Sequence, residues 1–226
     1  MLALIESSHM DETIRTIAVF ALPVLFAITL HEAAHAYAAK YFGDNTAYSQ
    51  GRMSLNPLVH IDPLGTIVIP ILLYLFSGFV FGYAKPVPVD FGRLRNPKRQ
   101  MAWVALAGPG ANFIMAVMWL IFSGILVFFS VNESFWHHMA QAGIVTNLLI
   151  MAFNLLPIPP LDGGRVVTSF LPHRAAYAFA RIEPYGFFIV LGLVLLKLVG
   201  YWLQPVMAAG RWLVHLVALP FTFFLF

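Results

Sequence analysis

The sequence of 226 residues contains no cysteine. This absence excludes disulfide bonds, thiolate metal ligands and a cysteine nucleophile. Any bound metal would have to be held by histidine, aspartate or glutamate side chains, and any nucleophile would have to be water or a hydroxyl group.

Charged residues are also scarce. Only 10% of the positions are charged, whereas 60% are hydrophobic and the mean hydropathy is +0.81. A soluble globule needs more polar surface than this, so we expect an integral membrane protein in a lipid bilayer. The net charge of +3 is small, the basic residues gather in short loops, and no nucleic-acid-binding motif is present. Nucleic acid is therefore not expected as a partner.

Long polar segments are missing too. The longest, near 42–63, 84–100 and 157–183, are too short for a folded extramembrane module, which usually needs about 50 residues. The apolar segments are each close to the roughly 20 residues of a membrane-spanning helix, and they lie near 14–41, 64–83, 101–130, 139–156, 184–203 and 205–226. We predict one all-α polytopic membrane domain, 1–226, with about five to six transmembrane segments. It would comprise a core of about 14–170 and a C-terminal helix pair of about 184–226.

The first apolar run contains the pattern His31-Glu32-Ala33-Ala34-His35. On a helix, residues four apart share a face, so His31 and His35 can present two imidazoles to one metal ion while Glu32 reaches a water on that metal. Two histidines and a glutamate in an apolar span are costly unless they are paired or bind a metal. We therefore predict a metal site, on a retained helix rather than a cleaved signal peptide.

A second pattern lies far downstream and reads Asn154-Leu-Leu-Pro157-Ile-Pro159-Pro160-Leu161-Asp162-Gly163-Gly164. Its three prolines forbid a regular helix and its two glycines permit a tight turn, so Asp162 can point back into the helix bundle. A carboxylate inside a membrane is a functional residue by default. Asp162 could instead be a turn residue that precedes a cytoplasmic helix.

Two imidazoles and one carboxylate supply three protein ligands. A tetrahedral zinc ion then keeps its fourth position open for water, as a catalytic site requires. Zinc lowers the pKa of such a water to about 7, and Glu32 can accept its proton during attack on a peptide carbonyl and return it to the leaving amine. We predict a hydrolase with one Zn²⁺ per chain, held by His31, His35 and Asp162.

HExxH in a membrane helix with a distant NxxPxPxLDGG resembles the site-2 proteases, the intramembrane zinc metalloproteases. Two further stretches are similar to that family. Gly108-Pro109-Gly110-Ala111-Asn112-Phe113 is similar to its GPxxN element. Gly82-Tyr83-Ala84-Lys85-Pro86 resembles a strand-forming stretch beside its active site. The resemblance covers about 20–170. It implies the same zinc ligands, Glu32 as the catalytic glutamate, and Asn154 as a residue that holds the substrate backbone or the developing oxyanion.

The resemblance also implies that the substrate is a transmembrane helix of another membrane protein. A helical peptide bond is shielded by its own hydrogen bonds, so the scissile stretch must be unwound and held extended, for example by addition to an edge strand at 78–88. No segment would make the PDZ or CBS domain of many family members. The chain therefore resembles the compact subgroup, and its regulatory partner is unknown.

Basic residues orient the helices. The loop at 84–100 holds five Lys and Arg and the connection at 131–138 holds none, so the former is expected in the cytoplasm and the latter outside. If Asp162 meets the two histidines near the cytoplasm, a full crossing by 64–83 would place the basic loop outside. We therefore predict a re-entrant or β-hairpin-like element near 64–90. The expected location is the bacterial inner membrane, with an archaeal membrane second and the active site nearer the cytoplasm.

Two other functions are weighed against this one. A metal transporter or channel could use the His/Asp cluster as a passage site. A di-iron hydroxylase would need clustered histidine boxes, and only two pairs of histidines are close in sequence, His31 with His35 and His137 with His138. His60 and Asp62 could bind a further metal, although a turn before a membrane segment is the more common role of such residues.

Overall fold

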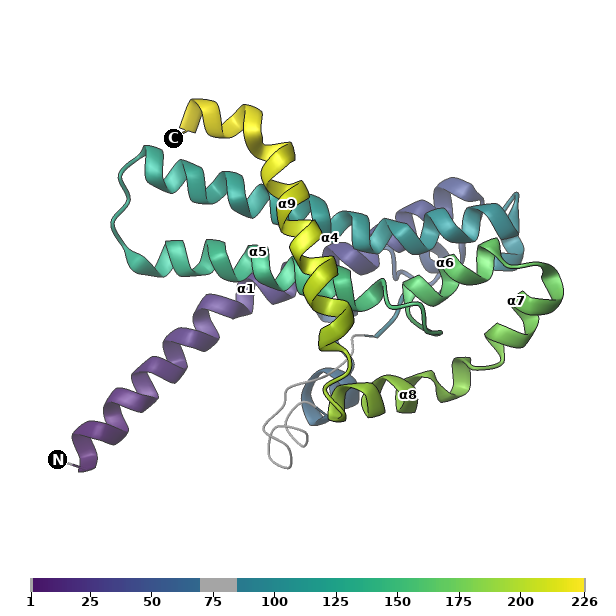
Figure 1. Ribbon diagram of the computed structural model, residues 1–226, viewed down its shortest axis with the longest axis horizontal. Helices are drawn as coiled ribbons and strands as arrows, with labels where there is room; N and C mark the ends of the chain where they lie inside the picture. The colour runs from purple at the N-terminus through teal and green to yellow at the C-terminus, as the bar shows by residue number, and fades with distance from the viewer. Residues whose placement is uncertain (1, 70–84, 226) are drawn as a thin grey trace. The chain divides into compact units, whose positions relative to one another are not determined.

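The fold is that of a computed structural model, which describes residues 2–69 and 85–225. In chain order, its elements are α1 (Leu2–Phe42), α2 (Thr46–Ser49), η1 (Pro57–Val59), η2 (Pro63–Val68), η3 (Phe91–Arg93), α4 (Pro97–Phe128), α5 (Ser134–Asn154), α6 (Asp162–Phe170), α7 (His173–Ala180), α8 (Glu183–Leu195) and α9 (Gly200–Leu225) (Figure 1). The described ranges contain no strand, so the all-α prediction is confirmed for them. Most of the element predicted near 64–90 falls at 70–84, outside the described residues.

Two helices are long and apolar enough to span a membrane. They are Ile14–Phe42, within α1, and Pro97–Phe128, which is α4. A third span results if α7 and α8, which are bent by 63° at their junction, are counted as one. These helices fit a membrane-helical protein, whereas the number of five to six spans stays a prediction.

The helices near the C-terminus differ in their bounds from the apolar runs. Helix α8 ends at Leu195, before the expected end near 203, because the chain turns at Lys197, whose φ is +61°. Helix α9 begins at Gly200 and continues through Pro205. Hydropathy alone cannot detect such a turn, because an apolar run stays apolar through it.

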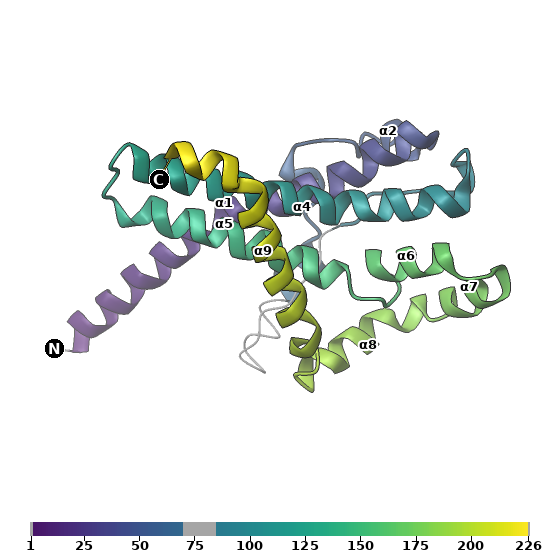
Figure 2. The same ribbon diagram turned by 45° about the horizontal axis from the view of Figure 1, so that its top comes forward.

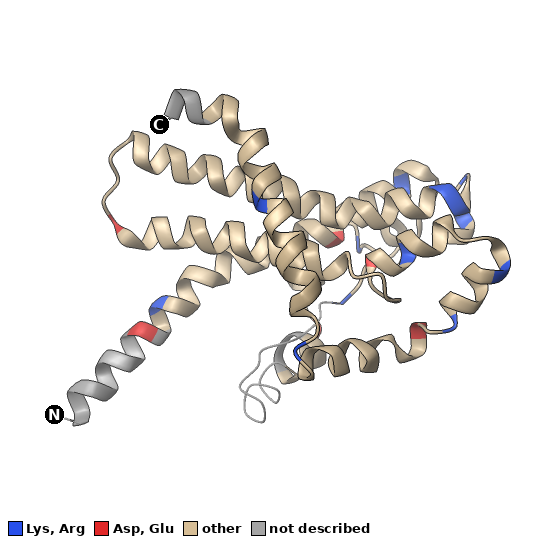
Figure 3. Ribbon diagram, in the orientation of Figure 1, with Lys and Arg blue, Asp and Glu red and all other residues tan. Residues whose placement is uncertain are grey.

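The chain divides into two compact units. Unit 1 comprises Met1–Ala27, Asn112–Phe153 and Val199–Phe226, and unit 2 comprises Ile28–Ala111 and Asn154–Leu198. Of the 13 Lys and Arg residues, only Arg15 and Arg211 belong to unit 1 (Figure 3). Unit 2 therefore holds nearly all of the basic residues of the chain.

In unit 1, α5 runs back beside the C-terminal half of α4 (Figures 1 and 2). Two buried asparagines, each 0% exposed, link the helices. Asn112 Nδ2 donates hydrogen bonds of 3.0 Å to the Ala27 carbonyl and to Asn147 Oδ1, and Asn147 Nδ2 donates one of 2.8 Å to the Gly143 carbonyl. Polar side chains buried in a membrane need such partners, because lipid offers none.

In unit 2, the segment 85–90 is tied to its neighbours at both ends. The Lys85 amide donates to the His60 carbonyl at 2.9 Å, and the Asp90 amide donates to Asp44 Oδ2 at 2.7 Å. Asp44 follows the end of α1 and is 1% exposed. These bonds fix the segment beside the C-terminal part of α1.

His60 and Asp62 have the hydrogen bonds of turn residues. His60 Nε2 donates to the Ser54 carbonyl at 2.9 Å, and Asp62 Oδ1 accepts a bond of 2.8 Å from the Gly65 amide at the start of η2. Neither belongs to a group of three potential metal ligands within the described ranges. These contacts favour the turn interpretation over a second metal pair.

The packing of unit 1 predicts that Gly143→Ala destabilises the protein. A Cβ atom at Gly143 would lie 2.3 Å from Trp119 Cδ2, and overpacking of this kind costs about 1–3 kcal/mol. We expect a lower thermal unfolding temperature in detergent. Gly192→Ala is the matched control, since nothing lies within 4 Å of the Cβ position at Gly192. Equal unfolding temperatures for the two variants would contradict the described contact between α4 and α5.

Candidate metal centre

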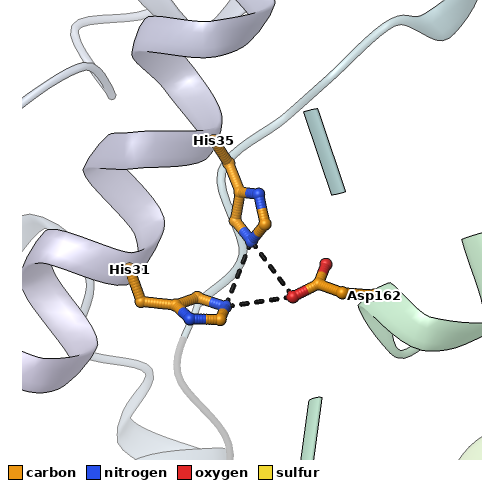
Figure 4. Close-up of side chains that lie close together, drawn as sticks. All are labelled: His31, His35 and Asp162. Carbon is orange, nitrogen blue, oxygen red and sulfur yellow. Dashed lines mark hydrogen bonds and ion pairs between the residues drawn. The ribbon is translucent and has the colours of Figure 1, made fainter. Parts of the chain in front are cut away.

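Three potential metal ligands converge within unit 2 (Figure 4). His31 and His35 project from α1, and Asp162 is the first residue of α6. The Nε2 atoms of the two histidines are 3.1 Å apart, and Asp162 Oδ2 lies 3.2 Å from that of His31 and 3.3 Å from that of His35. The three residues are buried, with exposed fractions of 5%, 8% and 6%. The expected meeting of the two sequence patterns is thus present.

The triangle of atoms has the dimensions of a tetrahedral zinc site. Zinc bonds to nitrogen and oxygen of about 2.0–2.1 Å separate the ligand atoms by about 3.3–3.4 Å, close to the three distances between these side chains. Asp162 Oδ2 is buried and accepts no hydrogen bond from the residues that the structure describes. When neither Nε2 carries a proton, as metal ligation requires, these three atoms present lone pairs to one another in a buried site and repel unless a cation lies between them. The donor set therefore fits Zn²⁺.

The tautomer of His35 also suits a metal ligand. Its Nδ1 lies 2.8 Å from the Val104 carbonyl of α4, and since a carbonyl can only accept, the proton is assigned to Nδ1. The lone pair of Nε2 is then directed at Asp162 and His31. A hydrogen bond of this kind to the second ring nitrogen orients metal-binding histidines and raises their basicity.

Asp162 is held in its ionised form. Burial by itself raises the pKa of the carboxyl group, but in the metal-free site the adjacent imidazoles of His35 and His31, when they carry a proton, outweigh burial and hold the pKa well below its usual range. The carboxylate is therefore available as a metal ligand at neutral pH.

The glycines after Asp162 act differently from the prediction. The sequence suggested a tight turn, whereas Gly163 and Gly164 are helical and form the first turn of α6. Their role is close packing, because a Cβ atom would lie 2.2 Å from the Leu155 carbonyl oxygen at Gly163 and 2.4 Å from the Pro159 nitrogen at Gly164. The proline-containing loop 155–161 is non-helical, as predicted, and it packs against these two glycines so that Asp162 is presented at the start of a helix.

Gly108 is a site residue whose role the sequence did not reveal. Its missing side chain makes room for both imidazoles, because a Cβ atom there would lie 2.4 Å from His35 Nε2 and 2.7 Å from His31 Cε1. Gly108 is one helical turn after Val104 on α4, so one face of that helix both orients His35 and accommodates it. The GPxxN element contained this signal, but nothing in the sequence says what the glycine faces.

Two predicted site residues lie outside the cluster of three. Glu32 is half-buried, and its Oε2 accepts a hydrogen bond of 2.8 Å from the Val87 amide. Asn154 is half-buried and ends α5, at the start of the loop that leads to Asp162. In the described ranges, no other group of three His, Cys, Asp or Glu could hold a metal ion.

Comparisons with known proteins identify a protein family that this chain matches. The model of peptidase family M50 matches residues 19–142 and 124–197. YwhC of Bacillus subtilis is 38% identical over 195 residues, which cover 84% of this chain and 86% of the relative. Rip2 of Mycolicibacterium smegmatis is 32% identical over 181 residues, or 79% of this chain and 67% of the relative. MJ0392 of Methanocaldococcus jannaschii is 28% identical over 177 residues, or 78% of this chain and 41% of the relative. The names of all three describe zinc metalloproteases. No solved structure matches the chain significantly.

The contact at Gly108 predicts that Gly108→Ala lowers zinc affinity. The added methyl group would have to displace the imidazoles of His31 and His35, and loss of ligand orientation costs about 10–100-fold in metal affinity. The measurement is a zinc competition titration of the purified protein with a chelator. Gly110→Ala, on the same helix with nothing within 4 Å of its Cβ position, is the control. An unchanged affinity in Gly108→Ala would refute the described packing.

Proposed function

Since this chain belongs to peptidase family M50, the site-2 protease family, and is a zinc metalloprotease, we propose that it hydrolyses peptide bonds in or near transmembrane helices of other membrane proteins. The observation that carries the proposal is the buried His31–His35–Asp162 cluster, because two of its residues lie on a helix long enough to span a membrane. Family membership favours hydrolysis over the transporter that the sequence left open.

The proposed division of labour follows from residue chemistry. His31, His35 and Asp162 would hold one Zn²⁺ and leave a fourth position open. When bound, zinc supplies Lewis acidity, which makes water a nucleophile at neutral pH. Glu32 follows His31 directly on α1, and its carboxylate would accept a proton from that water and then donate it to the leaving amine.

Asn154 is proposed to bind the substrate backbone. It ends α5 immediately before the loop that leads to Asp162, so its amide lies at the boundary between α5 and that loop. A carboxamide can donate to a peptide carbonyl and accept from a peptide amide. Such a side chain suits a substrate strand that has been unwound from its own helix and must replace its lost hydrogen bonds.

The proposed location is the bacterial inner membrane with the active site nearer the cytoplasm. The support is the distribution of basic residues, because unit 2 contains the metal-binding cluster together with all Lys and Arg residues except Arg15 and Arg211. Under the positive-inside rule the basic loops are cytoplasmic. A site near that face would draw its water from the cytoplasm.

The role of Glu32 is tested by Glu32→Gln. The amide keeps the size of the side chain and cannot accept a proton, so cleavage of a model transmembrane substrate is expected to fall by about 10²–10⁴-fold. The measurement is cleavage by purified protein in detergent or liposomes, with zinc content determined in parallel. Zinc content should stay near one per chain in Glu32→Gln and fall in His31→Ala. Full activity of the Glu32→Gln variant would exclude this glutamate as the general base.

The role of Asn154 is tested by Asn154→Ala. If the amide binds the substrate both before and in the transition state, the catalytic efficiency kcat/KM should fall by about 5–150-fold, which corresponds to the loss of a bond worth about 1–3 kcal/mol. Steady-state kinetics on the same substrate would measure the change, and zinc content should not change. Wild-type kinetics in this variant would remove Asn154 from the substrate site.

A further inference from the structure

A backbone amide holds the side chain of Glu32. Glu32 lies on α1, and its Oε2 accepts the 2.8 Å hydrogen bond from the Val87 amide. A glutamate side chain has several rotatable bonds, so a carboxylate without an anchor would sample many orientations. The bond to Val87 restricts these torsions and engages one carboxylate oxygen, while the second oxygen is left for a proton transfer.

The sequence around Val87 isolates this donor. Val87 stands between Pro86 and Pro88, and proline has no amide hydrogen. The Val87 amide is therefore the one backbone donor within 86–88. A following proline also restricts the preceding residue to extended conformations, so the direction of this amide is limited by the covalent structure of the chain.

Side-chain packing fixes the amide opposite Glu32. Val87 is 6% exposed and packs in one cluster with Ala36 and Ala47. Ala36 is four residues after Glu32 and lies on the same face of α1. The side chain of Val87 thus packs one turn beyond the carboxylate that its amide contacts.

Arg52 adds a further restraint to the segment. Its Nη2 donates to the Lys85 carbonyl at 3.0 Å and to the Pro86 carbonyl at 3.4 Å. With the bonds already described at the amides of Lys85 and Asp90, the chain is held on both sides of Val87. An amide so restrained can impose an orientation on a flexible partner.

We propose that the backbone amide of Val87 is a positioning group that orients the Glu32 carboxylate for catalysis. The inference rests on the catalytic role proposed above for Glu32. A pre-oriented carboxylate needs little reorganisation at the moment of proton transfer, which favours the transition state over the bound substrate. Loss of the amide should therefore lower kcat more than it changes KM.

The test is Val87→Pro, which removes the amide hydrogen in a segment whose flanking prolines already impose extended backbone. We expect kcat on the model transmembrane substrate to fall by about 10–100-fold, with KM within about twofold and zinc content unchanged. The variant Val87→Ala loses part of the packing but keeps the amide, so it should retain clearly more activity than Val87→Pro. Val89→Pro, a proline two residues further on, is the control for proline insertion. Wild-type kcat in Val87→Pro, or equal losses in Val87→Pro and Val89→Pro, would overturn the proposal.

A second measurement reports the hydrogen bond without catalysis. In metal-free protein, Val87→Pro should lower the thermal unfolding temperature in the Glu32→Gln background, where the side chain can still accept the bond. It should have a smaller effect in the Glu32→Ala background, where no acceptor remains. Equal shifts in the two backgrounds would show that no bond joins the residues and would overturn the inference.

The two proposals fail in different ways. An active Glu32→Gln enzyme would end the catalytic role of Glu32 and with it the positioning role, whatever the stability measurements show. An inactive Glu32→Gln enzyme together with a fully active Val87→Pro enzyme would overturn only the positioning role of the amide.

Discussion

The structure depends on bringing together three buried atoms that can ligate one metal ion. His31 Nε2, His35 Nε2 and Asp162 Oδ2 lie 3.1–3.3 Å apart, and each can offer a lone pair to the same point once both nitrogens are unprotonated. Such an arrangement is unfavourable without a cation and matches the coordination distances of zinc with one. The surrounding chain can be understood as the scaffold that holds these atoms in place.

Backbone groups and small residues provide most of this scaffold. The Val104 carbonyl orients His35, and the absence of a side chain at Gly108 makes space for both imidazoles. Gly163 and Gly164 let α6, which begins with Asp162, approach the loop before it. Polar side chains would need partners of their own in an apolar interior, so glycines and backbone atoms can surround the site at lower cost.

The same reasoning connects the metal centre to the proposed chemistry. Glu32 follows His31 directly in sequence, and its carboxylate accepts a hydrogen bond from a segment more than fifty residues away, at Val87. Because the residues on both sides of Val87 are prolines, its amide is the one backbone donor within 86–88, and packing of its side chain directs that amide at the carboxylate. Catalytic geometry would thus be shared between a helix and a non-helical segment, each of which restrains a different part of the site.

Much of the site could be predicted from the sequence because its signals are local. The spacing of His31 and His35 places both on one helix face. The prolines before Asp162 interrupt a helix whatever residues surround them in the fold. The pairing of these distant patterns also followed from chemistry, since a third ligand was needed and cysteine was absent. The role predicted for Gly163 and Gly164 was wrong, because the sequence cannot distinguish a glycine that allows a turn from one that allows close packing.

The sequence by itself determined the class of the protein and its ligand types, because composition sets the solvent a chain can tolerate and residue chemistry sets the metal it can hold. Only the tertiary structure decided the neighbours of each ligand: the carbonyl at Val104, the space at Gly108 and the amide at Val87. Two of these groups are backbone atoms and the third is the absent side chain of a glycine. A sequence does not show which backbone atom or which glycine will lie beside a site residue, because only packing brings the two together.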